Sequence, residues 1–293
     1  MTNPAVVLGL AVAFCFGTSD YLSKGLTLKV GFYRTTVYTL ATSGAIVIPP
    51  LLLLGAPGWP NYSDLLVLSL IAVSTFAAFF FMYRGYSRGN LSVVSPVVNS
   101  FPIFSVLFAL FVLGIHLSLD VLLALAGVIL GILFVSVDIS ALGSERGRGL
   151  TPGVPEALAA SLLFAVALTS LGDAYSKMGY LLPSVAARVG GAFVGLAAGL
   201  ASKQDLRLFG GDALRRVLVM GVLEASGLTL FSLAFFYSTN LVVLPIVTTL
   251  AGMGVVFTVG LALLLLREKV ALNYAVGIVT LVVSVGALLY LTA

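Results

Sequence analysis

The sequence predicts an all-α integral membrane protein whose ten transmembrane helices form two inverted five-helix repeats. Three observations support this prediction: the chain is very apolar, it divides into ten segments of membrane-spanning length, and a polar pattern recurs half a chain apart. Of 293 residues, 60% are hydrophobic and 9% are charged, against roughly 25% charged in soluble domains. So few polar side chains cannot cover a globule in water, and we expect a lipid bilayer around the protein.

Each expected helix is an apolar stretch near the ~20 residues that cross a bilayer's hydrocarbon core. The clearest break between stretches is glycine-rich and charged and lies at 143–149. We therefore divide the chain into a first repeat over 1–138, a linker over 139–152 and a second repeat over 153–293. The expected spans are 4–22, 31–54, 64–83, 91–114, 119–137, 154–174, 181–201, 216–236, 241–266 and 271–291.

The recurring polar pattern links the two halves. An aspartate followed by a serine and a lysine occurs at Asp20–Lys24 and again, 153 residues later, at Asp173–Lys177. Arg34 and Arg188 follow these patterns and lie 154 residues apart. Five spans per repeat is an odd number, so the second repeat enters the membrane from the opposite side. The halves should then be related by a pseudo-two-fold axis in the membrane plane, as in many secondary transporters.

Loop charges give an orientation. Ten lysines and arginines lie in the loops after the third, fifth, seventh and ninth spans. The loops after the second, fourth and eighth spans and the two termini carry none. The positive-inside rule then places the basic loops in the cytoplasm and both termini outside.

The composition also excludes several classes of protein. A net charge of +4 gives no indication of nucleic-acid binding, and the single His116 excludes a histidine metal cluster. The single Cys15 cannot form an intrachain disulfide. The chain has no G-x-x-x-x-G-K-[ST] phosphate loop, so the sequence gives no support for ATP-driven transport. We expect no cofactor, no metal and no nucleic-acid partner.

Glu224 is the acidic residue closest to the middle of an expected span. An ionised carboxylate is costly at that depth, so we expect it to be neutral unless a basic group pairs with it. It is our candidate for proton coupling or for binding a solute amine. The alternative is a hydrogen-bonded carboxyl that ties helices together. The residue 149 positions earlier is Thr75, so any role of Glu224 is asymmetric between the repeats.

The repeated aspartate–lysine pairs are spaced for ion pairing. Asp20 with Lys24, and Asp173 with Lys177, stand at i and i+4, which places both charges on one helix face. They are either self-neutralising pairs at helix ends or a gate, with the pairs at opposite faces breaking alternately. Arg34 and Arg188 begin the second and seventh spans. Each either pairs with its own repeat's aspartate in a structural role or holds a substrate carboxylate.

Prolines interrupt the fourth and ninth spans at matching positions. Pro96 and Pro245 are 149 residues apart, and each is expected to kink its helix and free a backbone carbonyl. Interrupted helices at matching positions are typical of transport sites, although polar contacts between helices are the alternative. The tyrosines at span ends suit either an interfacial belt or this site. The expected substrate contacts are Ser95, Asn99, Ser100, Thr248, Thr249, Tyr83 and Tyr237.

These residues resemble a known family over nearly the whole chain. Phe16-Gly17 followed by Lys24 and Arg34, the stretch from Asn90 to Pro96, and Leu266-Arg-Glu268 through Gly277 resemble the ten-helix EamA-type branch of the drug/metabolite transporter superfamily. The resemblance implies two inverted repeats, a central cavity and small-solute transport, often export of amino acids or related metabolites.

The resemblance has two departures. The acidic residue usual at the fourth-to-fifth turn is missing from the first repeat, where His116 stands nearby. Relatives also keep both termini in the cytoplasm, contrary to the loop charges, so both orientations stay open.

We therefore expect a secondary transporter that moves a small organic solute by alternating access, with an amino acid or related metabolite as the solute and export as the direction. It should be a multi-pass protein of a prokaryotic plasma membrane, with the bilayer and a small molecule as partners. The sequence leaves the oligomeric state open and is compatible with a monomer. The alternatives are a lipid-modifying enzyme and a channel. Widely separated acids and a single histidine argue against the enzyme.

Overall fold

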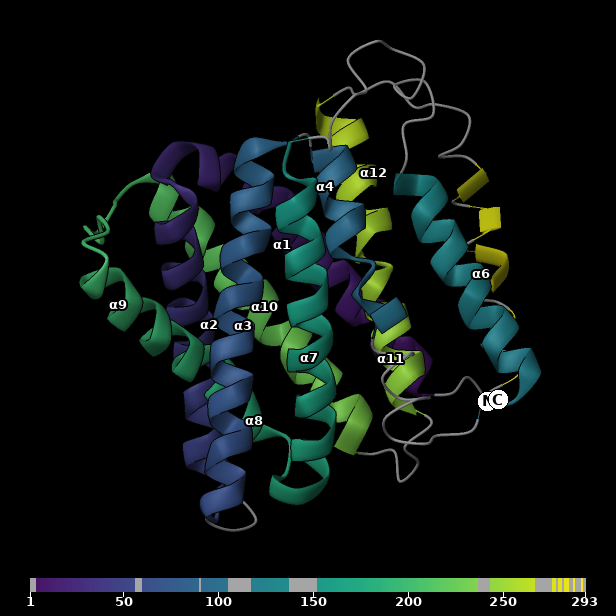
Figure 1. The fold of residues 1–293 in the computed structure, drawn as a ribbon, viewed down its shortest axis with the longest axis horizontal. Helices are drawn as coiled ribbons and strands as arrows, with labels where there is room; N and C mark the ends of the chain where they lie inside the picture. Colours follow the sequence, from purple (N-terminus) through teal and green to yellow (C-terminus); the bar gives the residue numbers. More distant parts are fainter. Residues whose placement is uncertain are drawn as a thin grey trace.

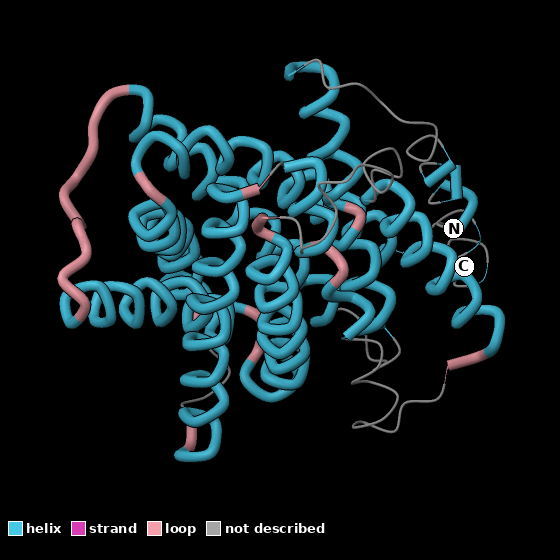
Figure 2. The backbone as a smooth tube through the Cα atoms, turned by 45° about the horizontal axis from the view of Figure 1, so that its top comes forward, coloured by secondary structure: helices cyan, strands magenta, loops and turns pink. Residues whose placement is uncertain are grey.

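The computed structural model describes residues 4–55, 60–89, 91–104, 117–136, 152–236, 243–266 and parts of 276–291. Every regular element within these ranges is helical, and the helices run up and down one bundle (Figures 1 and 2). The helices are α1 (Pro4–Val30), α2 (Phe32–Leu54), α3 (Tyr62–Arg88), α4 (Leu91–Val98), α6 (Leu119–Ser136), α7 (Val154–Met178), α8 (Leu181–Val185), the π-helical turn η2 (Ala186–Gly190), α9 (Gly191–Ala201), α10 (Asp212–Phe236), α11 (Val243–Gly252) and α12 (Gly254–Leu266).

The structure confirms an all-helical membrane protein. Five helices are long and apolar enough to cross a bilayer, at Phe32–Leu54, Tyr62–Arg88, Val154–Met178, Leu181–Ala201 and Asp212–Ala234. The described residues add shorter apolar helices, at Val94–Phe104, Leu119–Gly131 and Thr249–Leu261. The count of ten spans and the division into repeats stay predictions, and the linker over 139–152 lies almost wholly outside the described residues.

Several helices continue past the ends that hydropathy predicted. The first helix was expected to end at residue 22 but continues to Val30, and α3 continues to Arg88. Lys24, inside this extension, donates hydrogen bonds to the carbonyls of Tyr86 and Gly89 at the end of α3. A lysine that satisfies the last carbonyls of a neighbouring helix stabilises both helix ends. Charge therefore did not mark a helix boundary here.

The interrupted spans break at different points from those predicted. Pro96 lies inside α4, and the helix is interrupted only at Asn99 and Ser100, just before Pro102. Pro245 lies in α11, whose described part begins at Val243. Within the described residues the ninth span breaks at Met253, between Gly252 and Gly254. The kinks at Pro96 and Pro245 themselves stay predictions.

The most extensive helix contacts support a repeated architecture. They are formed by α1 with α10 and by α3 with α7, which Figure 1 shows running side by side through the middle of the bundle. The predicted repeats make α1 equivalent to α7, and α3 equivalent to α10. The contact of α1 with α10 is then equivalent to the contact of α7 with α3. A pseudo-two-fold axis would produce such a pair of equivalent contacts.

The helix directions give a topology prediction. Arg34, near the start of α2, contacts Asp205 and Arg207, whereas α2 ends near the start of α3. Cysteines at Tyr62 and at Leu208, which are 79% and 82% exposed, should therefore be labelled from opposite membrane faces, in a background where the buried Cys15 is alanine. The positive-inside rule predicts that position 208 is the cytoplasmic one, and the same labelling decides this orientation. Labelling of both positions from one face would contradict a membrane-spanning α2.

Candidate functional site

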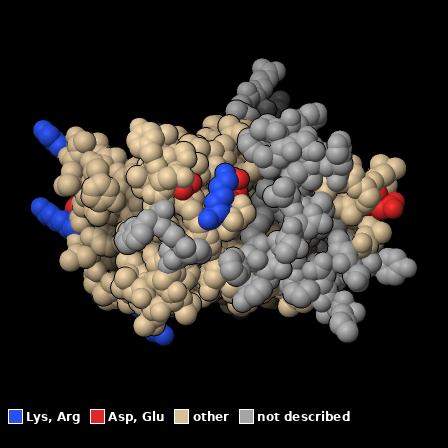
Figure 3. Space-filling model, turned by 90° about the horizontal axis from the view of Figure 1, so that it is seen from below, with Lys and Arg blue, Asp and Glu red and all other residues tan. Residues whose placement is uncertain are grey.

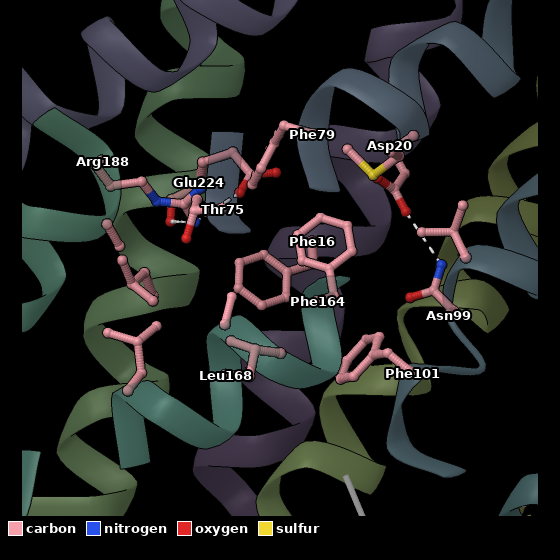
Figure 4. A pocket seen from close by; sticks show the side chains of 16 residues that line it. Phe16, Asp20, Thr75, Phe79, Asn99, Phe101, Phe164, Leu168, Arg188 and Glu224 are labelled. Atoms are coloured by element: carbon pink, nitrogen blue, oxygen red, sulfur yellow. Dashed lines mark hydrogen bonds and ion pairs between the residues drawn. The ribbon is translucent and has the colours of Figure 1, made fainter. Parts of the chain in front are cut away.

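A cavity lies midway along the bundle, between α1, α3, α4, α7, η2 and α10. Its volume is about 50 Å³, several times what one water molecule needs. The lining is largely apolar, with rings that stand between two polar groups of residues (Figure 4). The aromatic residues are Phe16, Phe79, Phe101 and Phe164, and the polar residues are Asp20, Thr75, Asn99, Arg188 and Glu224.

Arg188 and Glu224 form a buried ion pair at one side of the cavity. Nη2 of Arg188 lies 2.9 Å from Oε2 of Glu224 and 3.3 Å from its carbonyl oxygen, and each side chain is 3% exposed. The guanidinium also stands 4.9 Å from the centre of the Phe79 ring, a favourable cation–π contact. The sequence showed no cation close to Glu224 along the chain. The structure provides one from the neighbouring span, 36 residues away.

A π-helical turn positions Arg188. The turn covers Ala186–Gly190 and widens the helix of the seventh span. Such turns are rare in proteins, and many of those that occur lie at functional sites. Gly190 then lets the span approach α3, because a Cβ there would lie 2.8 Å from the Cβ of Ala72. Arg188 is thus eight residues into its span and faces the cavity, rather than standing at a helix start as the sequence suggested.

Asp20 and Asn99 form the second polar group. Asp20 is 6% exposed, and Nδ2 of Asn99 lies 3.3 Å from its Oδ2. The same amide nitrogen contacts the carbonyl and the hydroxyl of Ser95, at 2.9 and 3.3 Å. The break in the fourth span thus presents Asn99 to the cavity, and Ser95 holds it there.

Other predicted contacts lie outside the cavity or outside the described residues. Ser100 bonds Ser161 of α7, with 3.1 Å between hydroxyl oxygens. Tyr83 is fully buried beside Phe79 rather than at a membrane interface, and Thr249 is fully buried in α11. Among described side chains, none of these three lines the cavity. The Thr248 side chain and the whole of Tyr237 are not described.

The two repeated aspartate–lysine pairs are not equivalent. Asp173 and Lys177 form the predicted ion pair at 2.7 Å, but both are more than half exposed, so the pair contributes little stability. The predicted pair of Asp20 with Lys24 is wrong: within the described residues Asp20 bonds Asn99, and Lys24 bonds the end of α3.

Arg34 also departs from the predicted pattern. It does not pair with an aspartate of its own repeat and lies 3.4 Å from Asp205, in the loop after α9.

Sequence analysis missed a charged cluster where α3 ends and α7 begins. Glu156, in the first turn of α7, has a side chain that is 11% exposed and pairs with both Arg84 and Arg88 of α3. Gly89 packs tightly beside it, since a Cβ there would lie 2.1 Å from the carbonyl oxygen of Pro152. The basic residues were counted only for orientation, and nothing in their spacing indicated an acidic partner from the other half.

Apolar helices of this length, packed around a partly charged cavity, are typical of a multi-pass membrane protein. Residues 3–137 match the EamA-like transporter family, which bears out the resemblance over the first half of the chain and indicates a membrane transporter of the drug/metabolite transporter type. A solved structure described as "Crystal structure of protein" covers 98% of this chain and 98% of its own length, with a TM-score of 0.75 and 16% identity. That likeness concerns the fold alone. None of the curated proteins matches the chain.

Proposed function

We propose that the protein is a secondary transporter that carries a small organic solute through the central cavity by alternating access. The observation that carries this proposal is the position of the cavity. It is midway along the bundle, it is lined by helices from both predicted halves, and it contains buried charged groups. Buried charges within membrane spans usually mark a solute or ion pathway. The EamA-type match supports a transporter, and export is the proposed direction.

The polar groups of the cavity suit an amino acid or a related metabolite. Nε and Nη1 of Arg188 are buried and make no hydrogen bond within the described residues, so they could donate to a solute carboxylate. Asp20 and Glu224 lie in the same cavity and could accept from an amine. The aromatic rings between them provide an apolar surface for the solute's remaining atoms.

The charged cluster at the end of α3 supports a gate in this mechanism. Glu156 connects α7, in the second predicted half, to Arg84 and Arg88 of the first half. Lys24 meanwhile ties α1 to the last turn of α3. Opening this end would require Glu156 to separate from the two arginines. Figure 3 views the opposite end, where basic and acidic side chains lie near the middle of the face and others lie at its edges. At this end α7 finishes with the exposed pair of Asp173 and Lys177.

A change at Asn99 tests the transport site. We expect Asn99→Leu to insert and fold but to lose at least about 90% of transport, because leucine removes the amide that faces Asp20. A thermal-shift screen of the purified protein across metabolite classes would first identify a solute. Uptake into proteoliposomes then gives the rate. Saturation and counterflow by the unaltered protein would separate a carrier from a channel.

The matched control is Thr229→Val in α10, whose hydroxyl bonds only its own helix among described residues and whose transport should be unchanged. Wild-type rates for Asn99→Leu would place the solute elsewhere.

A further inference from the structure

The charges of the cavity do not balance. Arg188 and Glu224 neutralise each other, which leaves the carboxyl of Asp20. Among the ion pairs of the described residues none includes Asp20, and its carboxyl accepts a hydrogen bond from the neutral amide of Asn99. Lys24 stands one turn further along α1, but its ammonium group contacts the end of α3.

The neighbours of Asp20 do not supply a positive charge. The phenols of Tyr86 and Tyr83 face it from α3, Glu224 faces it from α10, and Asn99 faces it from α4. An isolated ionised carboxylate in an apolar interior is very costly. The group must therefore be neutralised by a proton or by a cation that enters the cavity.

The surroundings favour an organic cation over a metal ion. A bound metal ion needs several oxygen, nitrogen or sulfur ligands, and the described residues contain no group of three histidine, cysteine, aspartate or glutamate side chains placed to hold one. The cavity instead carries Phe16, Phe79, Phe101 and Phe164. Aromatic faces attract alkylammonium groups through cation–π contacts, most strongly where water is excluded.

We propose that Asp20 is the cation site of the cavity, occupied in turn by a proton and by the ammonium group of an organic solute. The arriving cation displaces the proton: the Oδ–H bond breaks, the proton leaves to water, and the ammonium takes its place beside the carboxylate. Asn99 positions the carboxylate through its amide. This inference rests on the proposed transport function and narrows its solutes to those with a cationic nitrogen. We assign the proton exchange to Asp20 and not to Glu224, because the charge of Glu224 is already balanced by Arg188.

Proton release on binding tests the site. The probe is phenyltrimethylammonium, a permanent cation, and its neutral counterpart is tert-butylbenzene. Calorimetric titration of the full chain in buffers of different ionisation enthalpy gives the number of protons released per cation bound. At a pH where free Asp20 is protonated, we expect about one proton to be released per cation bound. In that range the affinity for the cation should fall about tenfold for each unit by which the pH is lowered. The neutral counterpart should release none.

The variants assign the proton to a residue. Asp20→Asn should bind the cation at least about tenfold more weakly and release no proton. Asp120→Asn, which removes an exposed acid at the start of α6, should behave like the unaltered protein. If Asp20→Asn fails to fold, Asp20→Glu should retain the proton release with a changed affinity.

Three results would overturn the proposal: an undiminished proton release from Asp20→Asn, cation binding by the unaltered protein without proton release, or no cation binding at all. The first would transfer the role to Glu224, which Glu224→Gln would then confirm. Failure here is distinguishable from failure of the transport proposal. A protein that transports neutral or anionic solutes but binds no cation keeps the proposed function and loses this inference, whereas a protein without saturable flux of any solute loses both.

Discussion

Replacing Arg188 with glutamine is expected to destabilise the protein by about 3–5 kcal/mol, because it would leave Glu224 as a buried charge without its partner. Both side chains are 3% exposed and their charged atoms are 2.9 Å apart. Denaturant or thermal unfolding in detergent measures the effect. Glu224→Gln should cost a similar amount, because it leaves the guanidinium uncompensated. The double change Arg188→Met with Glu224→Leu should recover much of the loss, since neither charge is then buried alone.

The control for this prediction is the arginine that shares the repeated sequence pattern. Arg34 pairs with Asp205, whose side chain is 58% exposed. Exposed pairs contribute about 0–1 kcal/mol, so Arg34→Gln should have a small effect. Equal losses for Arg188→Gln and Arg34→Gln would show that the cavity pair contributes nothing special to the fold.

Gly17→Ala is expected to force α1 and α12 apart and to destabilise the bundle by about 1–3 kcal/mol or more. A Cβ at position 17 would lie 2.1 Å from the carbonyl oxygen of Gly254, and backbone cannot move aside as a flexible side chain can. The contact also carries a hydrogen bond of 2.9 Å from the hydroxyl of Thr258 to the carbonyl of Gly17. Small residues that let helices approach closely are typical of membrane bundles.

Gly260→Ala, in the same helix α12, is the matched control. A Cβ there meets no atom of the described residues within 4 Å, so alanine should be neutral or slightly stabilising through its higher helix propensity. In detergent the melting temperature should therefore fall for Gly17→Ala and should stay level or rise for Gly260→Ala. Equal melting temperatures for the two variants would show that the close approach of α1 to α12 does not limit stability.

The sequence predicted the fold well because apolar length is a local property. Five of the ten expected spans are described helices long and apolar enough to cross a bilayer, shorter apolar helices lie within three others, and the count of ten stays a prediction. The helix ends were less predictable, since the extension of α1 to Val30 includes Lys24, whose partners are 62 and 65 residues away. The described breaks lie at Asn99–Ser100 and at Met253, three and eight residues after the prolines from which interruptions were predicted.

The candidate site was predicted as a set of residues but not as an arrangement. Asp20, Asn99, Arg188 and Glu224 all stood out as polar groups inside or beside apolar spans, and all line the cavity. The sequence could not predict which of these residues pair. Arg188 contacts Glu224 because two spans pack together and because a π-helical turn positions the arginine, and no residue pattern indicates that turn. The repeated motif also misled, since Asp20 is buried and Asp173 is exposed.

The single uncompensated carboxyl in the cavity has an electrical consequence. One elementary charge that crosses a membrane held at 100 mV gains or loses about 2.3 kcal/mol. Arg188 and Glu224 add no net charge. If Asp20 is the cation site that we propose, the species bound there sets the net charge that each transport cycle moves across the membrane. Exchange of a proton for a simple ammonium ion moves no net charge, and a pH difference alone can drive it. Exchange of a proton for a zwitterionic amino acid moves one charge, and membrane voltage then adds to the drive. A voltage-clamped proteoliposome would therefore report the solute's charge without knowledge of its structure.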